Sequence, residues 1–100
     1  MKKKVFISFP AIHREEHYMR KIISSLKELR MFQDYTILSP LNNIDKYGDE
    51  EYEEAVAHDL ALMIKCDAFY FTKDCERSKL SQVQRAVAKV YDISEFKQIK

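Results

Sequence analysis

The chain contains a single glycine, Gly48, and this scarcity argues against several classes of nucleotide enzyme. Loops of the Gly-x-Gly-x-x-Gly and Walker types need several glycines, because the backbone must approach the phosphates closely. Neither motif occurs, and Gly-x-Ser-x-Gly and a Ser/His/Asp order are also missing. The sequence therefore argues against kinases, NTPases, NAD-dependent dehydrogenases and hydrolases with a catalytic triad.

Cysteine is also scarce. Cys66 and Cys75 do not form a Cys-x-x-Cys pair, and no histidine lies at metal-ligand spacing from them. His13 and His17 lie on one face of an expected helix, but a third ligand is lacking. We therefore expect two reduced thiols, no metal site and no cofactor.

Long apolar runs and an excess of one charge are missing as well. No apolar run reaches the roughly 18 residues of a membrane span, and residues 5–12 are too short for the apolar part of a signal peptide. The 17 basic and 16 acidic residues nearly cancel, which gives no reason to expect a polyanionic partner. We expect a cytoplasmic protein that binds neither nucleic acid nor membranes.

Short apolar segments that alternate with amphipathic ones predict the secondary structure. Strands are expected at residues 5–9, 35–38 and 68–71, a loop at residues 42–50, and a further short strand within residues 94–100. The apolar residues expected to face the core are Met19, Ile22, Ile23, Leu26 and Leu29 in the first helix, Tyr52, Ala55, Val56, Leu60, Met63 and Ile64 in the second, and Leu80, Val83, Val87 and Val90 in the third.

This β-α-β-α-β-α order predicts one α/β domain over residues 1–100. We expect a three-layer Rossmann/flavodoxin-like fold, with a mostly parallel sheet of about four to five strands and helices on both faces. A ligand crevice should lie at the carboxyl ends of the strands, where residues 8–10 and 72–78 approach each other. The small core also favours self-association as a homodimer or higher homo-oligomer.

Two polar positions are candidates for a role in a site. Asp59 falls at the edge of the core-facing stripe of the second helix, where it either contacts a ligand or pairs with Lys65 or Arg85. Ser78 precedes the third helix, where its hydroxyl either caps backbone amides or helps to hold a phosphate. Four aromatic residues either pack in the core or form a surface on which a base could stack. They are Phe9, Tyr18, Tyr47 and Tyr52.

Over about residues 4–92 the pattern resembles the nucleoside 2-deoxyribosyltransferase-like superfamily, especially a short uncharacterised branch of the DUF4406 type and the related deoxynucleotide N-hydrolases. The resemblance rests on the opening strand Lys4-Val5-Phe6-Ile7-Ser8-Phe9-Pro10, on Asp59 eight positions before Asp67, and on Ser78-Lys79 leading into Ala86-Val87-Ala88-Lys89. It implies substrate binding by Ser8, Phe9, Pro10 and Ser78, with Asp59 contacting sugar hydroxyls or serving catalysis.

The resemblance also implies a catalytic glutamate on the third helix, and Gln84 occupies that position. A neutral amide cannot attack the anomeric carbon of the sugar as a carboxylate does. Phe9 and Leu80-Ser81 further replace small family residues with bulkier ones. A domain that binds a nucleoside or nucleotide with impaired or absent N-glycosidic chemistry is therefore expected.

Two alternatives stay open. An active N-glycosidase or deoxyribosyltransferase would need another carboxylate, such as Asp59, Asp74 or Glu76. The Val-Phe-Ile-Ser-Phe strand also resembles the opening of Toll/interleukin-receptor domains, which implies an interaction module or an NAD-cleaving module.

Overall fold

The strands form one parallel sheet with the order β2-β1-β3-β4. The computed structural model describes residues 2–10, 14–73 and 78–96. Along the chain the elements are β1 (Lys3–Ser8), α1 (Glu16–Lys27), the short 3₁₀ helix η2 (Arg30–Phe32), β2 (Tyr35–Leu38), α2 (Pro40–Tyr47), α3 (Tyr52–Met63), β3 (Ala68–Phe71), α4 (Lys79–Val90) and β4 (Ser94–Phe96).

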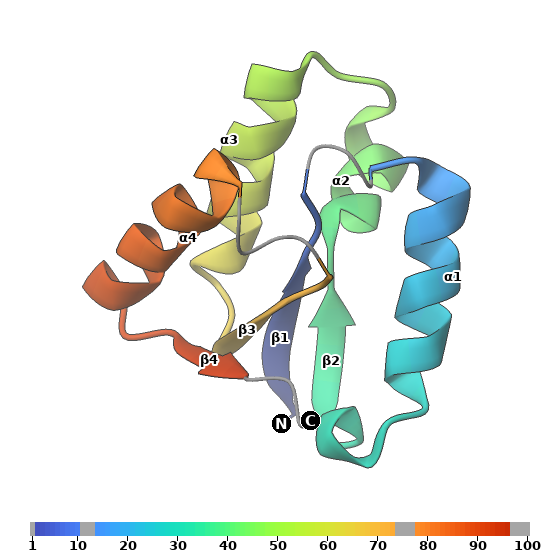
Figure 1. Cartoon of the computed structure of the whole chain (residues 1–100), viewed down its shortest axis with the longest axis vertical. Coiled ribbons are helices and arrows are strands. Elements are labelled where there is room, and N and C mark those ends of the chain that lie inside the picture. Colours follow the sequence, from blue (N-terminus) through green and yellow to red (C-terminus); the bar gives the residue numbers. More distant parts are fainter. Residues whose placement is uncertain (1, 11–13, 74–77, 97–100) are drawn as a thin grey trace.

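Helices cover both faces of this sheet (Figure 1). Because side chains alternate along a strand, β1 contributes to two separate cores. Val5 and Ile7 pack in one cluster with Met19 and Ile23 of α1, whereas Phe6 packs in the other with Met63 of α3. The second cluster also receives Ala88 of α4. These layers confirm the predicted three-layer α/β fold.

The chain reverses its direction of travel across the sheet between β1 and β3. From β1 it passes through α1 to β2 on one side, and after β2 it returns past β1 to β3. Open parallel sheets bind ligands at such a switch point, outside the carboxyl ends of the strands. Thr72 after β3 donates a hydrogen bond from its hydroxyl to the carbonyl oxygen of Ser8, at 2.9 Å. The segments after β1 and β3 are thus neighbours, as predicted.

The loop predicted at residues 42–50 was wrong over most of its length, because α2 occupies Pro40–Tyr47. The Ser39 hydroxyl accepts a hydrogen bond from the Leu41 amide at 3.2 Å, and the Asn42 side chain accepts one from the Ser39 amide at 2.9 Å. Proline is favourable in the first turn of a helix, since its missing N–H has no partner there anyway. Pro40 therefore starts a helix after β2. Gly48, with φ of +76°, follows it.

The core-facing stripes predicted for the last two helices need correction. Val83 and Val90 of α4 are 46% and 76% exposed, and Tyr52 and Ile64 at the ends of the predicted α3 stripe are exposed too. The face of α4 that is buried consists of Leu80, Ser81, Gln84 and Ala88. Polar residues are tolerated there because the Ser81 hydroxyl donates to the Ser78 carbonyl at 2.7 Å and Gln84 bonds to Ser8. Leu29, predicted for the first helix, lies beyond α1 and is exposed.

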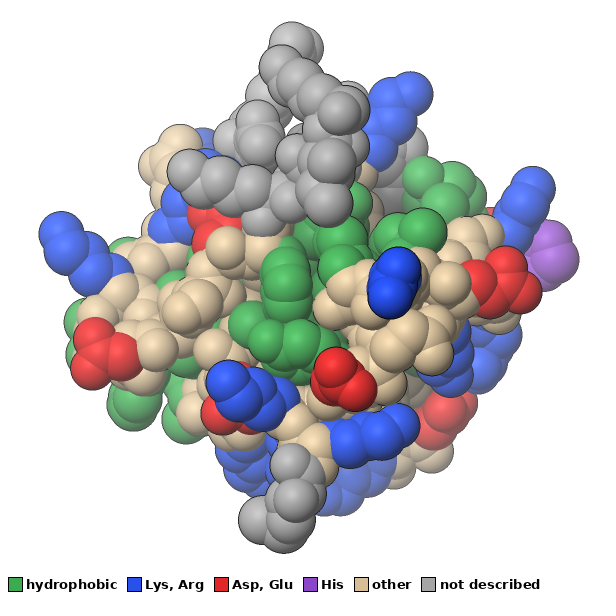
Figure 2. Space-filling view, turned by 90° about the horizontal axis from the view of Figure 1, so that it is seen from below, with side chains coloured by type: hydrophobic (Ala, Val, Ile, Leu, Met, Phe, Trp, Pro, Cys, Tyr) green, Lys and Arg blue, Asp and Glu red, His purple; other side chains and the backbone are tan. Residues whose placement is uncertain are grey.

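The face seen from below Figure 1 lies at the amino ends of the strands (Figure 2). Hydrophobic side chains gather near its centre, and basic and acidic side chains are both scattered around them. No helix within the described ranges is long and apolar enough to cross a membrane. The expected self-association stays a prediction.

Candidate functional site

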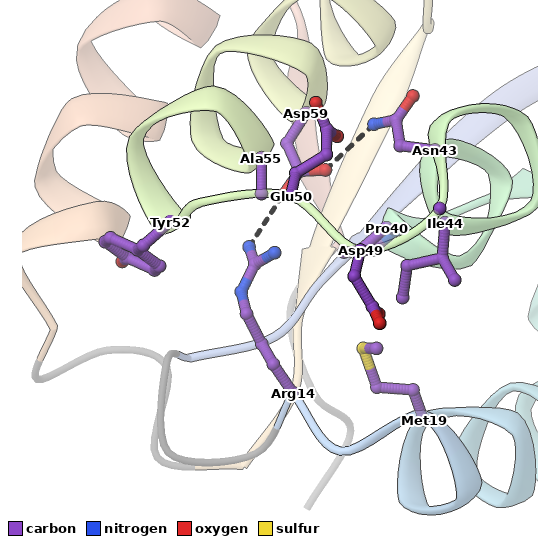
Figure 3. Close-up of a pocket in the computed structure, with 11 residues that line it drawn as sticks. Arg14, Met19, Pro40, Asn43, Ile44, Asp49, Glu50, Tyr52, Ala55 and Asp59 are labelled. Carbon is purple, nitrogen blue, oxygen red and sulfur yellow. Dashed lines mark hydrogen bonds and ion pairs between the residues drawn. The ribbon is translucent and has the colours of Figure 1, made fainter.

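A cavity of about 280 Å³ opens beside the carboxyl ends of the strands, between the start of α1, α2 and α3 (Figure 3). Ligand pockets in proteins typically have volumes of about 300–1,000 Å³, so this cavity suits a small ligand. Its apolar wall includes Met19 and Ile44. Its polar side chains are Arg14, Asn43, Asp49, Glu50, Tyr52 and Asp59.

Asp59 is the most deeply buried of these polar residues, at 1% exposure. One of its carboxylate oxygens, Oδ2, lies 2.6 Å from a terminal nitrogen of Arg14, and the other, Oδ1, accepts a hydrogen bond from the Asn43 amide at 2.9 Å. These partners come from the segment before α1 and from α2, and all three side chains point toward one another in Figure 3. The suggested partners Lys65 and Arg85 were wrong, since Arg85 pairs with Glu95 and Lys65 is exposed.

Burial and the two polar partners of Asp59 act in opposite directions on its ionisation. Burial raises the pKa of the Asp59 carboxyl above its ordinary value, because the charged form loses its contact with water. The positive charge of Arg14 and the hydrogen bonds from Arg14 and Asn43 lower that pKa, and the negative charge of Glu50 raises it further. The net result is a raised pKa of Asp59. Asp59 is therefore a carboxyl group of raised proton affinity at the wall of a cavity.

Arg14 links the carboxylate to an aromatic side chain. Its guanidinium carbon lies 6.0 Å from the centroid of the Tyr52 ring, at the edge of the range of a cation–π contact. Its Nε atom is buried and has no hydrogen-bond partner. Buried donors usually find an acceptor, so this Nε is an unsatisfied polar group within a residue that lines the cavity.

The loop between α2 and α3 is in contact with a cluster that the sequence did not predict. The imidazole of His58 stacks on the ring of Tyr47 with 3.9 Å between centroids and 5° between planes. Its Nδ1 atom lies 2.7 Å from Oε2 of Glu50. His58 directly precedes Asp59 in α3, so adjacent residues of this helix contact Glu50 of the loop and the cavity residues Arg14 and Asn43.

Ser8 and Gln84 form a second polar centre at the switch between β1 and β3. The Ser8 hydroxyl donates a hydrogen bond to Oε1 of Gln84, and both side chains are fully buried. The Nε2 atom of Gln84 is buried and has no hydrogen-bond partner. Gln84 thus occupies the end of β1 in this conformation, where the family resemblance implies that a ligand would lie.

The other predicted binding residues are less accessible than the resemblance implies. Phe9 and Pro10 are buried, and Phe9 makes an edge-to-face contact with Tyr18 at 6.5 Å between centroids. The Ser78 hydroxyl accepts a hydrogen bond from the Ser81 amide at 3.1 Å and so caps α4, which is the commoner use of a serine at this position. Within the described residues, no hydrogen bond or ion pair joins Asp59 to Gln84.

The predicted candidates therefore divide between two places. Asp59 lies at the cavity, whereas Ser8, Gln84 and the cap of α4 lie at the switch point. The further candidate carboxylates Asp74 and Glu76, and also His13 and Cys75, lie outside the described residues. The polar cavity residues that sequence reasoning missed are Arg14, Asn43, Asp49 and Glu50.

Over residues 2–10, 14–73 and 78–96, no group of three or more His, Cys, Asp and Glu side chains is arranged to hold a metal ion. Cys66 is a free, buried thiol, and burial raises its pKa to about 11. Since the thiolate is the reactive form, this shift disfavours reactivity of the Cys66 thiol near neutral pH.

Comparisons with protein-family models, with curated proteins and with solved structures found no match to this chain.

Proposed function

We propose that this chain binds a nucleoside or nucleotide in the cavity between α1, α2 and α3, and does not cleave it. The observation that carries the proposal is the buried carboxylate of Asp59, which Arg14 and Asn43 hold at the cavity wall. An ionised carboxylate still has free lone pairs after two contacts, so it can accept hydrogen bonds from the hydroxyls of a sugar.

The remaining lining fits the other parts of such a ligand. Tyr52 offers an aromatic face, and aromatic faces hold planar heterocycles. The unpaired Nε of Arg14 is a donor for a ring nitrogen, a carbonyl or a sugar oxygen. The family resemblance, which implies that Asp59 contacts sugar hydroxyls, points to the same class of ligand.

Two features favour binding over catalysis. Gln84 is a neutral amide, and its oxygen already accepts the Ser8 hydroxyl. Asp59 pairs with a guanidinium at 2.6 Å, and this ion pair reduces the nucleophilicity of its carboxylate. Neither group is therefore free to attack an anomeric carbon.

The proposal is tested by titrating the protein with deoxynucleosides, deoxynucleotides and NAD by isothermal calorimetry. We expect a member of the nucleoside or nucleotide set to bind, and Asp59→Asn to weaken its binding by about tenfold or more, as loss of a charged hydrogen-bond acceptor does. Asp45→Asn is the matched control, because Asp45 is an exposed carboxylate on α2 that pairs with Arg20 outside the cavity. Equal losses in both variants, or no binding at all, would reject the proposal.

A second candidate function is N-glycosidic bond cleavage with Asp59 as the acid or base. The observation that favours it is the raised pKa of Asp59, because catalytic carboxyl groups are often tuned in this direction. Incubation with the same compounds and chromatography of free base separates the two functions. Base release that is lost in Asp59→Asn supports the enzyme. Nicotinamide release from NAD alone supports the Toll/interleukin-receptor-like alternative.

A further inference from the structure

The cavity has a marked imbalance of charge. Three carboxylates line it, those of Asp49, Glu50 and Asp59, and Arg14 is the only basic residue among its described lining residues. Figure 3 shows these charged side chains gathered around the same space. A ligand that enters the cavity therefore meets mainly negative charge.

The single guanidinium is already neutralised. Arg14 contacts Asp59 at 2.6 Å, and a charge pair of this kind presents little net field to a third group. The carboxylates of Asp49 and Glu50 remain. The side chain of Glu50 is only 11% exposed, and its Oε2 lies 2.7 Å from Nδ1 of His58 in α3. The negative charge of Glu50 also raises the pKa of Asp59, as the smallest of its causes.

We infer that the cavity accepts a nucleoside in its unphosphorylated form and rejects the corresponding 5′-monophosphate. This inference rests on the proposed function, and it names which of the two ligand classes the site takes. A phosphate monoester carries a charge of about −1.5 to −2 near neutral pH, so it is repelled by the two cavity carboxylates that Arg14 does not pair with, those of Asp49 and Glu50. A nucleoside has no such charge, and its hydroxyl and amino groups are donors for carboxylate oxygens.

Arg14 is also poorly arranged to offset this repulsion. A guanidinium binds phosphate best through two parallel N–H groups, and one terminal nitrogen of Arg14 is engaged by Asp59. Its Nε is buried and has no hydrogen-bond partner. Asp59 therefore competes with a phosphate for the N–H groups of Arg14.

The test compares three forms of the best-binding nucleoside by calorimetry: the nucleoside, its 5′-monophosphate, and its neutral 5′-dimethylphosphate ester. At about 20 mM NaCl we expect the monophosphate to bind at least about tenfold more weakly than the nucleoside. The neutral ester is bulkier than the monophosphate, but its affinity should fall less below that of the nucleoside. The loss of affinity that the phosphate causes, which we call the penalty, should be smaller at about 300 mM NaCl, because salt screens the repulsion.

Charge variants provide the second arm. In the double variant Asp49→Asn/Glu50→Gln the penalty for the phosphate should fall several-fold. Glu53→Gln/Glu54→Gln removes two exposed carboxylates of α3 that do not line the cavity, and it should leave the penalty unchanged.

The outcomes separate the inference from the proposed function. If no nucleoside or nucleotide binds, both fail. If the nucleoside binds and its monophosphate binds as tightly or more tightly, the cavity is still a nucleotide site but the inference is overturned. The inference also fails if the neutral ester is rejected as strongly as the monophosphate, since size would then be the cause. Tighter binding of the monophosphate that Ser78→Ala abolishes would overturn it too, and would place the phosphate at the start of α4.

Discussion

The hydroxyl of Ser8, at the end of β1, donates a hydrogen bond to the side-chain oxygen of Gln84 in the second turn of α4. This bond connects the central strand to a helix 76 residues away in the sequence. It also satisfies two polar groups that are fully buried. The position of the expected nucleophile is therefore part of the polar core between sheet and helix.

Gln84→Glu should destabilise the protein. The new carboxylate has no described basic residue bonded at this position, and burying an uncompensated charge is costly. We expect a loss of roughly 1–3 kcal/mol near neutral pH, with a smaller loss in acid, where the carboxyl is protonated. Urea unfolding at several pH values measures the effect. Gln82→Glu is the matched control, since Gln82 is exposed on the same helix; equal losses in both variants would show that burial is not the cause.

Much of the fold was predictable because its signals are local. Each strand or helix shows its own hydrophobic pattern, which depends only on residues within that element. Examples are the apolar segments of β1, β2 and β3 and the stripe of Met19, Ile23 and Leu26 in α1. The α2 helix was missed because Ser39-Pro40 is ambiguous: the same residues end a strand and start a helix. The valines of α4 were wrongly predicted to face the core, because hydrophobic periodicity does not show that Ser81 and Gln84 have buried hydrogen-bond partners.

Ser39→Ala should weaken α2. The Ser39 hydroxyl caps the first turn by accepting the Leu41 amide, and Asn42 returns a bond to the Ser39 backbone. Removal of such a cap costs about 1 kcal/mol. Chemical denaturation should therefore show a lower midpoint with an unchanged slope. Ser24→Ala is the comparison, because Ser24 is an exposed serine within α1; a loss as large in that variant would contradict a capping role.

Asp59 makes the stability of the protein depend on pH. Its pKa is raised in the folded state, so folding favours the protonated carboxyl. The contribution of Asp59 is then largest below its unfolded-state pKa of about 4 and is lost as pH rises through the raised folded-state value. Compared with Asp59→Asn, the wild type should lose stability as pH increases from about 4 toward neutrality. Unfolding free energies across this range measure the difference. A relative gain with rising pH would mean that Arg14 outweighs burial and lowers the pKa.

The candidate site was harder to predict than the fold. Asp59, Ser8 and Gln84 stood out because each is a polar residue in an apolar pattern or at a family position. Their partners did not, since Arg14 and Asn43 lie 45 and 16 residues from Asp59 and no local period connects them. The bond between Ser8 and Gln84 likewise depends on how β1 and α4 pack. Long-range polar contacts of this kind follow from the packing, which the sequence pattern alone does not fix.

Tyr47→Ala should loosen the loop that carries Asp49 and Glu50. The Tyr47 ring supports His58 by stacking, and His58 in turn contacts Glu50. Without the ring, His58 loses a contact of about 0.5–1.5 kcal/mol and no longer holds Glu50 as firmly. Local opening of the loop becomes easier by the same amount, which corresponds to roughly a 2- to 13-fold faster hydrogen exchange of the amides at residues 48–51.

Tyr91→Ala provides the control for this change, because Tyr91 is a tyrosine of similar exposure at the far end of α4. It should leave the exchange of residues 48–51 as it is in the wild type. His58→Phe tests the two contacts separately, since phenylalanine keeps the stack on Tyr47 and loses the contact to Glu50. If the stack alone holds the loop, His58→Phe behaves as the wild type. If the contact to Glu50 is required, as we expect, His58→Phe exchanges as fast as Tyr47→Ala. Unchanged exchange in all three variants would show that the cluster does not hold the loop.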